Sequence, residues 1–261
     1  MRCTRPADGA WELGRAGRYR EAVLSAQKIL ARRVCAAPPS TRVDAHLAIA
    51  FCAMRQGHLD EAKSHLEDAS RAASQDPSKM SLALHVDVWR AELAYFQGHY
   101  SSARRIVDRV LGLLAETNDQ KYTAFALRIR IALLLARGDY DGIAATADAA
   151  LKAAHASCDP YVQVQVLNIL GAAAFDRATT KLPVPHARAH LSSLEPHDTR
   201  SMEVDAREAL RYFERAAGVA RRGRYAFAAW YVAGNIERLQ IVLSLIIWVV
   251  NPVTAVTNAK K

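Results

Sequence analysis

The stretch Gly98-His99-Tyr100-Ser101-Ser102-Ala103 decides the fold, because the chain repeats its pattern at a nearly constant interval. Related stretches begin at Gly17, Gly57 and Gly138, and in the last of them Ile143 stands where the pattern expects Ala. The four glycines are therefore separated by 40, 41 and 40 residues. A period in this range is typical of stacked helical hairpins rather than of one globular core.

Each copy is interpreted as the tight turn between two antiparallel helices. Gly ends the first helix, because the residue after a helix end often adopts a positive φ that only Gly adopts cheaply. The Tyr or Leu two positions later can wedge between the two helices, and the small Ala five positions later lets their backbones approach. A single copy could be an ordinary helix end, but the constant interval favours a repeat whose hairpins cover one another's apolar faces. The expected repeat-turn residues are Gly17, Tyr19, Ala22, Gly57, Leu59, Ala62, Gly98, Tyr100, Ala103, Gly138 and Tyr140.

These motifs resemble the tetratricopeptide-repeat (TPR) family, whose pattern has Leu-Gly in the first helix and Gly-x-Tyr-x-x-Ala at the turn. The resemblance covers about residues 7–243, with an interval near 40 instead of the family's 34 and with Pro missing from most repeat ends. It implies an all-α fold, a right-handed superhelix (α-solenoid) of antiparallel helix hairpins. The nearest resemblance is to the extended repeats of bacterial regulatory and signalling proteins. The residues that carry it are Trp11, Leu13, Gly14, Gly17, Tyr19 and Ala22, then Ala50, Gly57, Leu59 and Ala62, and finally Asn168, Ile169, Leu170 and Gly171.

Apolar spacing and Pro-containing breaks divide the chain into five parts. We expect a disordered lead over residues 1–6, TPR-like repeats over 7–178, a Pro/His-containing loop over 179–200, a further repeat over 201–243 and a C-terminal tail over 244–261. A loop of that length is usually either functional or disordered. After a short first helix around Trp11, the expected helices are 19–34, 42–55, 59–73, 80–96, 100–115, 122–136, 140–156, 161–178, one from about 202 and one from about 225.

The tail is unlike the rest of the chain. The register of the repeats predicts a turn glycine at position 244, but Ser244 stands there and an apolar run follows before Asn251 and Pro252. Three interpretations stay open: a segment that caps the last hairpin, a truncated or frame-shifted end of a longer protein, and a membrane anchor. The apolar run is short of the roughly 20 residues that a membrane span requires.

Composition limits the functional classes without naming one. The chain has 35 Lys and Arg against 26 Asp and Glu, a formal net charge of +9. Such a balance suits nucleic acid, an anionic membrane or an acidic partner, but the charges are scattered and mixed, which favours solvated helix faces. The four cysteines show no paired spacing, and the N-terminus has no apolar signal region, so a cytoplasmic location is expected.

No motif for catalysis or cofactor binding is visible. The chain has no phosphate-binding loop, dinucleotide fingerprint, nucleophile elbow or HExxH sequence. His186 and His190 would share a face if their segment were helical, with His197 nearby, but Pro residues break the segment and a solvated loop is favoured. We therefore expect neither an enzyme nor a bound metal or cofactor.

The remaining candidate is the concave surface lined by the first helices. Placing each turn glycine in register predicts inward-pointing polar side chains that could read a peptide, because Arg binds carboxylates bidentately and Asn can pair with backbone. The leading hypothesis is a non-catalytic scaffold for a protein or peptide partner, the sensing or docking part of a bacterial signalling or regulatory protein. The alternatives are a nucleic-acid-associated repeat that uses Arg-rich patches and a tail-anchored scaffold, and an uncapped last repeat makes self-association plausible. The predicted partner-binding residues are Arg55, Glu92, Arg128, Asn168 and Arg238, and the Arg-rich patches comprise Arg104, Arg105, Arg128, Arg130, Arg221, Arg222 and Arg224.

Overall fold

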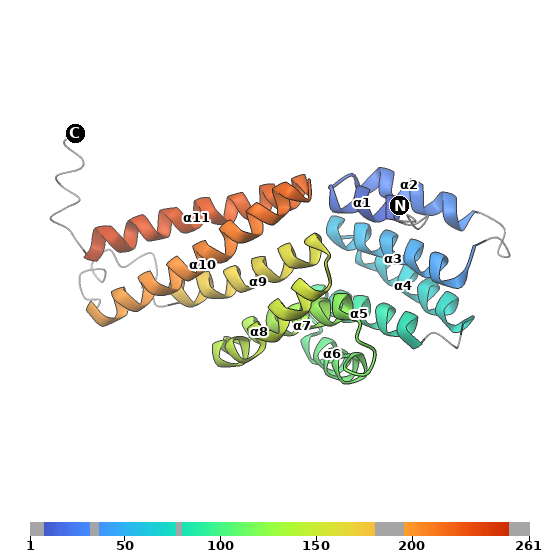
Figure 1. The fold of residues 1–261 in the computed structure, drawn as a ribbon, viewed down its shortest axis with the longest axis horizontal. Helices are drawn as coiled ribbons and strands as arrows, with labels where there is room; N and C mark the ends of the chain where they lie inside the picture. The colour runs from blue at the N-terminus through green and yellow to red at the C-terminus, as the bar shows by residue number, and fades with distance from the viewer. Residues whose placement is uncertain (1–7, 32–36, 77–79, 181–195, 251–261) are drawn as a thin grey trace.

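The computed structural model describes residues 8–31, 37–76, 80–180 and 196–250, and in those residues it contains eleven α-helices and no strand (Figure 1). The predicted all-α class is therefore confirmed for the described part of the chain. The helices are α1 (Asp8–Arg15), α2 (Tyr19–Leu30), α3 (Pro39–Gln56), α4 (Leu59–Ser74), α5 (Met80–Phe96), α6 (Tyr100–Leu114), α7 (Gln120–Leu135), α8 (Tyr140–Ala156), α9 (Pro160–Thr179), α10 (Pro196–Arg222) and α11 (Ala226–Val250).

Helix boundaries differ from the expected ones mainly near proline and at the end of the chain. α3 and α9 begin at Pro39 and Pro160, because Pro is tolerated in the first helical turn. α10 begins at Pro196 for the same reason, so it takes up the end of the expected loop 179–200, while residues 181–195 lie outside the described residues. α11 continues past Ser244 to Val250, so the apolar run extends the last helix. The lead 1–6 and residues 251–261 also lie outside the described residues.

The turns between hairpin helices are built on the repeated glycines. Gly17, Gly57, Gly98 and Gly138 have φ values of 81°, 82°, 75° and 67°. At Gly98 the backbone N–H bonds to the carbonyl of Tyr95, and the next N–H, that of His99, reaches back to the carbonyl of Ala94. The other three turns repeat this pair of bonds, which satisfies the last carbonyls of the preceding helix.

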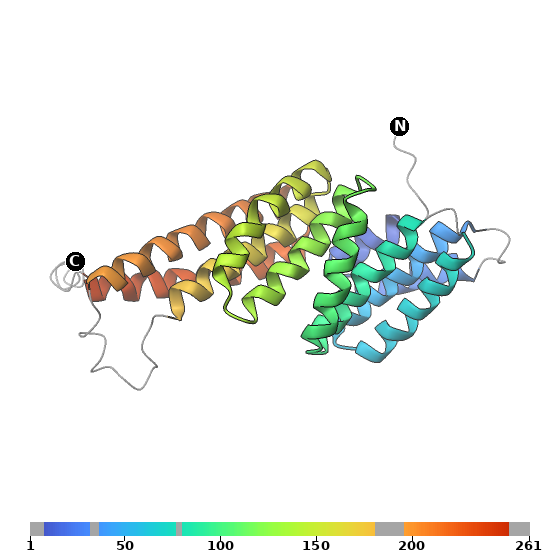
Figure 2. The same cartoon turned by 90° about the horizontal axis from the view of Figure 1, so that it is seen from below.

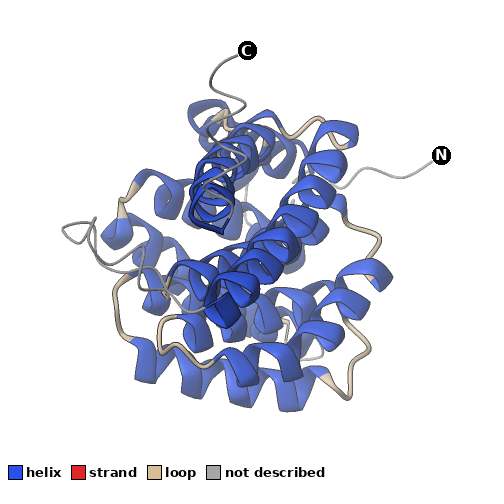
Figure 3. Cartoon of the chain, turned by 90° about the vertical axis from the view of Figure 1, so that its left-hand side faces the viewer, coloured by secondary structure: helices blue, strands red, loops and turns tan. Residues whose placement is uncertain are grey.

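The helices pack in chain order and form two layers. Each helix contacts its neighbour in sequence, and in addition α1 contacts α3, α3 contacts α5, α5 contacts α7, α7 contacts α9 and α9 contacts α11. The odd-numbered helices thus form an inner layer, with the even-numbered helices packed against it. The stack is elongated, as its side view shows (Figure 2), and in the view turned toward its end the helices overlap (Figure 3).

Aromatic side chains connect the inner helices through the core. Trp11 lies 5.5 Å from Trp89 and 5.6 Å from Phe51 between ring centroids, and Trp89 lies 5.6 Å from Phe125. Phe51 also meets Tyr161 edge to face at 6.1 Å. Such pairs each contribute about 0.5–1.5 kcal/mol beyond area burial, so they tie successive inner helices together.

The last helix leaves several large side chains in solvent. Trp230 is 71% exposed and Ile241 is 62% exposed on α11. None of the described helices is both long and apolar enough to cross a lipid bilayer.

Candidate functional site

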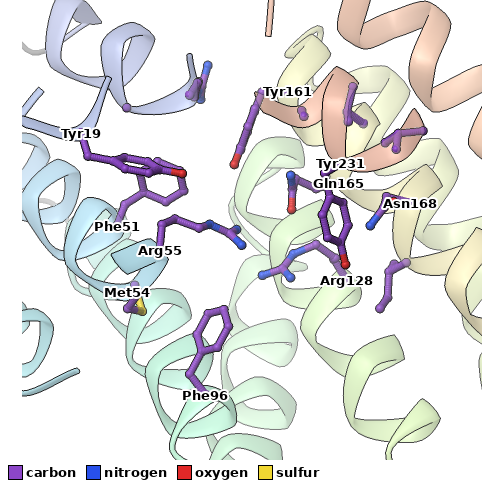
Figure 4. Close-up of a pocket in the computed structure, with 16 residues that line it drawn as sticks. Tyr19, Phe51, Met54, Arg55, Phe96, Arg128, Tyr161, Gln165, Asn168 and Tyr231 are labelled. Carbon is purple, nitrogen blue, oxygen red and sulfur yellow. The ribbon is translucent and has the colours of Figure 1, made fainter. Parts of the chain in front are cut away.

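A cavity of about 300 Å³ opens where the two ends of the helix stack approach each other. Its wall comes from α1, the start of α2, α3, the end of α5, α7, α9 and α11, so residues far apart in sequence face one space (Figure 4). The lining consists of Gly14, Arg15, Tyr19, Phe51, Met54, Arg55, Phe96, Arg128, Tyr161, Val164, Gln165, Asn168, Ile169, Ala228, Tyr231 and Val232.

Two arginines in this wall share one buried carboxylate. Glu92 on α5 is 3% exposed, and its Oε2 lies 2.8 Å from Nη2 of Arg128 while its Oε1 lies 3.6 Å from Nη2 of Arg55. The two guanidinium groups point toward each other at the cavity (Figure 4). Since one carboxylate faces two guanidinium groups, this arrangement carries one excess positive charge.

Arg128 retains hydrogen-bonding capacity inside the wall. Its side chain is 12% exposed, and its buried Nε has no hydrogen-bond partner within the described part of the chain. Leaving a buried donor of a charged group unpaired costs free energy.

Phenol and amide groups complete the polar part of the wall. The hydroxyl groups of Tyr19 and Tyr161 point toward the interior, and Gln165 and Asn168 face it from α9 (Figure 4). Burial raises the pKa of Tyr161, although Arg55 opposes the shift, so the phenol keeps its proton at neutral pH and can donate a hydrogen bond. Phe96 adds an apolar surface, and the guanidinium carbon of Arg55 lies 5.9 Å from the centre of its ring.

A second ion pair closes the stack beside the cavity. Arg15 at the end of α1 donates to both carboxylate oxygens of Asp159, at 3.4 and 2.9 Å, although the two residues are 144 positions apart. Asp159 is the N-cap of α9, and its Oδ1 also accepts from the backbone N–H of Tyr161. Burial alone would raise the pKa of Asp159, but Arg15 and Lys121 outweigh burial and hold this pKa below its ordinary value.

The structure brings most of the predicted partner-binding residues together. Arg55, Arg128 and Asn168 line the cavity, and Glu92 lies behind them as the shared carboxylate. Arg238 is exposed and does not line it, because it follows the lining residue Tyr231 by seven positions and so lies about 10 Å further along α11.

Several lining residues were missed by the sequence analysis. Tyr161 and Gln165 precede Asn168 by seven and three positions, so they share its face of α9 and the helical period could have found them. Arg15 and Tyr231 gave no such signal, because their place depends on how the two ends of the stack meet.

The wall of the cavity combines polar groups with apolar surface. No histidine, cysteine, serine or threonine is among the described residues that line it. What the wall offers is guanidinium, phenol and amide donors next to aromatic and aliphatic surface, which together suit an anionic group attached to an apolar one.

Comparison with known proteins adds little at this point. No family model matches the chain, and no curated protein matches it. Among solved structures, the chain is similar to BtubC (BKLC) from P. vanneervenii, with 14% sequence identity, a TM-score of 0.48, and coverage of 89% of this chain and 92% of that one. The site is therefore interpreted from its own residues.

Proposed function

We propose that this protein is a non-catalytic, TPR-like scaffold that binds an acidic segment of a protein partner in the central cavity. The observation that carries the proposal is that Arg55 and Arg128 share the single carboxylate of Glu92. Their guanidinium groups face a cavity whose wall is also partly aromatic and aliphatic. Two features support the TPR-like interpretation: the turn glycines with positive φ, which recur along the chain, and the packing of consecutive helices in two layers.

Charge balance favours an occupant with one carboxylate. The three lining arginines pair with three carboxylates, those of Glu12, Glu92 and Asp159, and Lys121 also pairs with Asp159, so this set has a net charge of +1. A partner carboxylate would balance it by accepting from the guanidinium groups that face the cavity, while its neighbouring side chain would pack on Phe96 or Tyr231. Charge-assisted bonds of this kind are about twice as strong as neutral ones.

Selection from a displayed peptide library tests the proposal directly. The chain is used to select peptides, the enriched sequences are synthesised, and fluorescence anisotropy measures their affinity for the wild type and for the double variant Arg128→Glu with Asn168→Ala. We expect enrichment of Asp, Glu or a free C-terminus next to apolar residues, and a loss of at least about tenfold in the variant, since removing a bond to a charged group costs about 1.5–3 kcal/mol.

The matched control is Arg130→Glu, on the same helix but exposed and outside the cavity. It should leave peptide affinity unchanged. Equal affinities for the wild type and the double variant would contradict the proposal, as would enrichment of peptides without any acidic group.

A second candidate function rests on a groove between α6 and α7. Arg104, Arg105, Arg130 and Arg137 line this groove of about 390 Å³, and Asp108 pairs with two of them, with Arg104 at 3.6 Å and Arg130 at 3.8 Å. This surface would favour the phosphate backbone of a nucleic acid. Its affinity should then fall steeply with salt through counterion release, and Arg130→Glu should weaken it while the cavity variant should not.

A further inference from the structure

A cluster of two histidines and one aspartate lies between the helices of the second hairpin. His46 comes from α3, and His65 and Asp68 come from α4, where they are three positions apart and share a face. Each is partly buried. Arg55, at the cavity, is nine residues from His46 on α3, so about 14 Å along the helix separates the cluster from the proposed partner site.

The ligand atoms of the cluster converge on one point. Nδ1 of His46 lies 3.1 Å from Nδ1 of His65 and 3.9 Å from Oδ2 of Asp68, and all three atoms lie within 4.8 Å of one another. A tetrahedral Zn²⁺ with bonds of about 2.0–2.1 Å holds its ligands roughly 3.3 Å apart. Small rotations of the side chains would therefore place all three on one ion.

The two imidazole rings face each other through their Nδ1 atoms. At this separation of 3.1 Å, one Nδ1 donates a proton into the hydrogen bond and the other accepts it. Moving that proton to Nε2 by a change of tautomer frees both Nδ1 lone pairs for a metal.

The surroundings of the cluster orient the carboxylate. Arg71 pairs with Oδ1 of Asp68, which leaves Oδ2 turned toward His46. Ligating carboxylates in metal sites are commonly held this way by an outer partner. Arg71 is exposed and Arg42 bonds to Gln75 at 2.7 Å, so solvent screens the repulsion that these two charges would exert on a cation.

We propose that His46, His65 and Asp68 form a binding site for a transition-metal dication, Zn²⁺ by preference, with water in the fourth position. Two imidazoles and one carboxylate are ligands that Zn²⁺ takes in three-ligand sites, whereas Mg²⁺ and Ca²⁺ require mostly oxygen ligands. The ion would join α3 to α4 and so brace the second hairpin. From the sequence, only His186, His190 and His197 were considered as ligands, and no metal was expected. His46 lies on a different helix from His65 and Asp68, so spacing along a single helix does not reveal the three as a group.

Titration of the chelator-stripped full chain with ZnCl₂ and CoCl₂ tests the site. The wild type should bind one equivalent that Mg²⁺ does not displace, and Co²⁺ should give the visible absorption of a tetrahedral complex. His65→Ala and Asp68→Asn should each weaken this binding at least about tenfold. Loss of a group that only supports a metal ligand already lowers metal affinity by about 10-fold to 100-fold, so loss of a ligand should cost at least as much. Zn²⁺ should raise the melting temperature of the wild type but not of these variants.

Two matched controls make the outcome unambiguous. His58→Ala removes an exposed histidine from the same hairpin, and a variant with His186→Ala and His190→Ala removes the other candidate pair. Both should bind Zn²⁺ and Co²⁺ as the wild type does. The proposal fails if Asp68→Asn and His65→Ala, with unchanged circular dichroism, keep the wild-type affinity, or if the affinity is lost only in the His186 and His190 variant.

Discussion

Replacing Glu92 by Gln removes the one carboxylate that two cavity arginines share, and we expect this change to destabilise the protein strongly. At an effective dielectric constant of about 20, the separations of 2.8 and 3.6 Å correspond to attractions of about 6 and 5 kcal/mol. Breaking a buried ion pair by removing one partner typically costs about 3–5 kcal/mol, since the remaining charge keeps its desolvation penalty. For a chain of this size, that loss corresponds to a fall in melting temperature of about 6–20 °C.

Thermal melting followed by circular dichroism measures this effect, and two further variants isolate it. Glu61→Gln breaks an exposed pair with His58 and should change stability by less than about 1 kcal/mol. Adding Arg128→Met to Glu92→Gln should restore part of the loss, because one uncompensated charge disappears. A fall of less than about 3 °C for Glu92→Gln would refute the view that this carboxylate holds the two guanidinium groups in place.

Three other measurements address the packing, the turns and the buried histidine. Gly171→Ala should destabilise the protein by about 1–3 kcal/mol, because its Cβ would lie 2.6 Å from a ring carbon of Phe213. Gly112→Ala, in an open helical position, should instead stabilise it by about 0.5–1 kcal/mol. Urea unfolding midpoints compare the two variants, and equal midpoints would contradict the packing argument. Gly98→Ala places a side chain at φ 75° and should cost about 1–2 kcal/mol in the same assay; an unchanged midpoint would mean that the turn does not need a left-handed residue. With chelator present, lowering the pH from 7 to 4.5 should remove about 2–3 kcal/mol of folding stability through His46, because His46 takes up a proton near pH 6.5 in the unfolded chain and only near pH 4 in the folded chain. The variant His46→Phe should lose less stability over this pH range. An equal loss in the variant would assign the effect to other groups.

The fold was largely predictable because each hairpin carries its own local signal. α5 and α8 have the bounds that apolar spacing and the turn glycines predicted, Met80–Phe96 and Tyr140–Ala156. The glycine also sets the rotation of the helix before it, which is why counting back from it found Arg55. Where that signal is absent, at Ser244, α11 continues to Val250, and Arg238 is exposed outside the cavity.

The rest of the candidate site depends on how the hairpins stack. The curvature of a repeat protein is the sum of small rotations between neighbours, and no short stretch of sequence encodes it. Arg15 and Asp159 therefore gave no sign that they would meet. The pairing of His46 with His65 was hidden for a related reason, because it depends on the facing of two helices rather than on spacing along one.

The ion pair between Arg15 and Asp159 can form only late in the synthesis of the chain. Most contacts join helices that are neighbours along the chain, so the first hairpins can fold on a ribosome while later ones are still being made. Asp159 leaves the ribosome only after all eight helices from α1 to α8 have been synthesised. Until then Arg15 lacks Asp159 as a partner, and the cavity lacks the parts of its wall that α9 and α11 supply. The cavity is therefore among the last parts of the protein to be completed, and a nascent chain interrupted before α9 would be folded over much of its length but would lack the complete surface that we propose binds a partner.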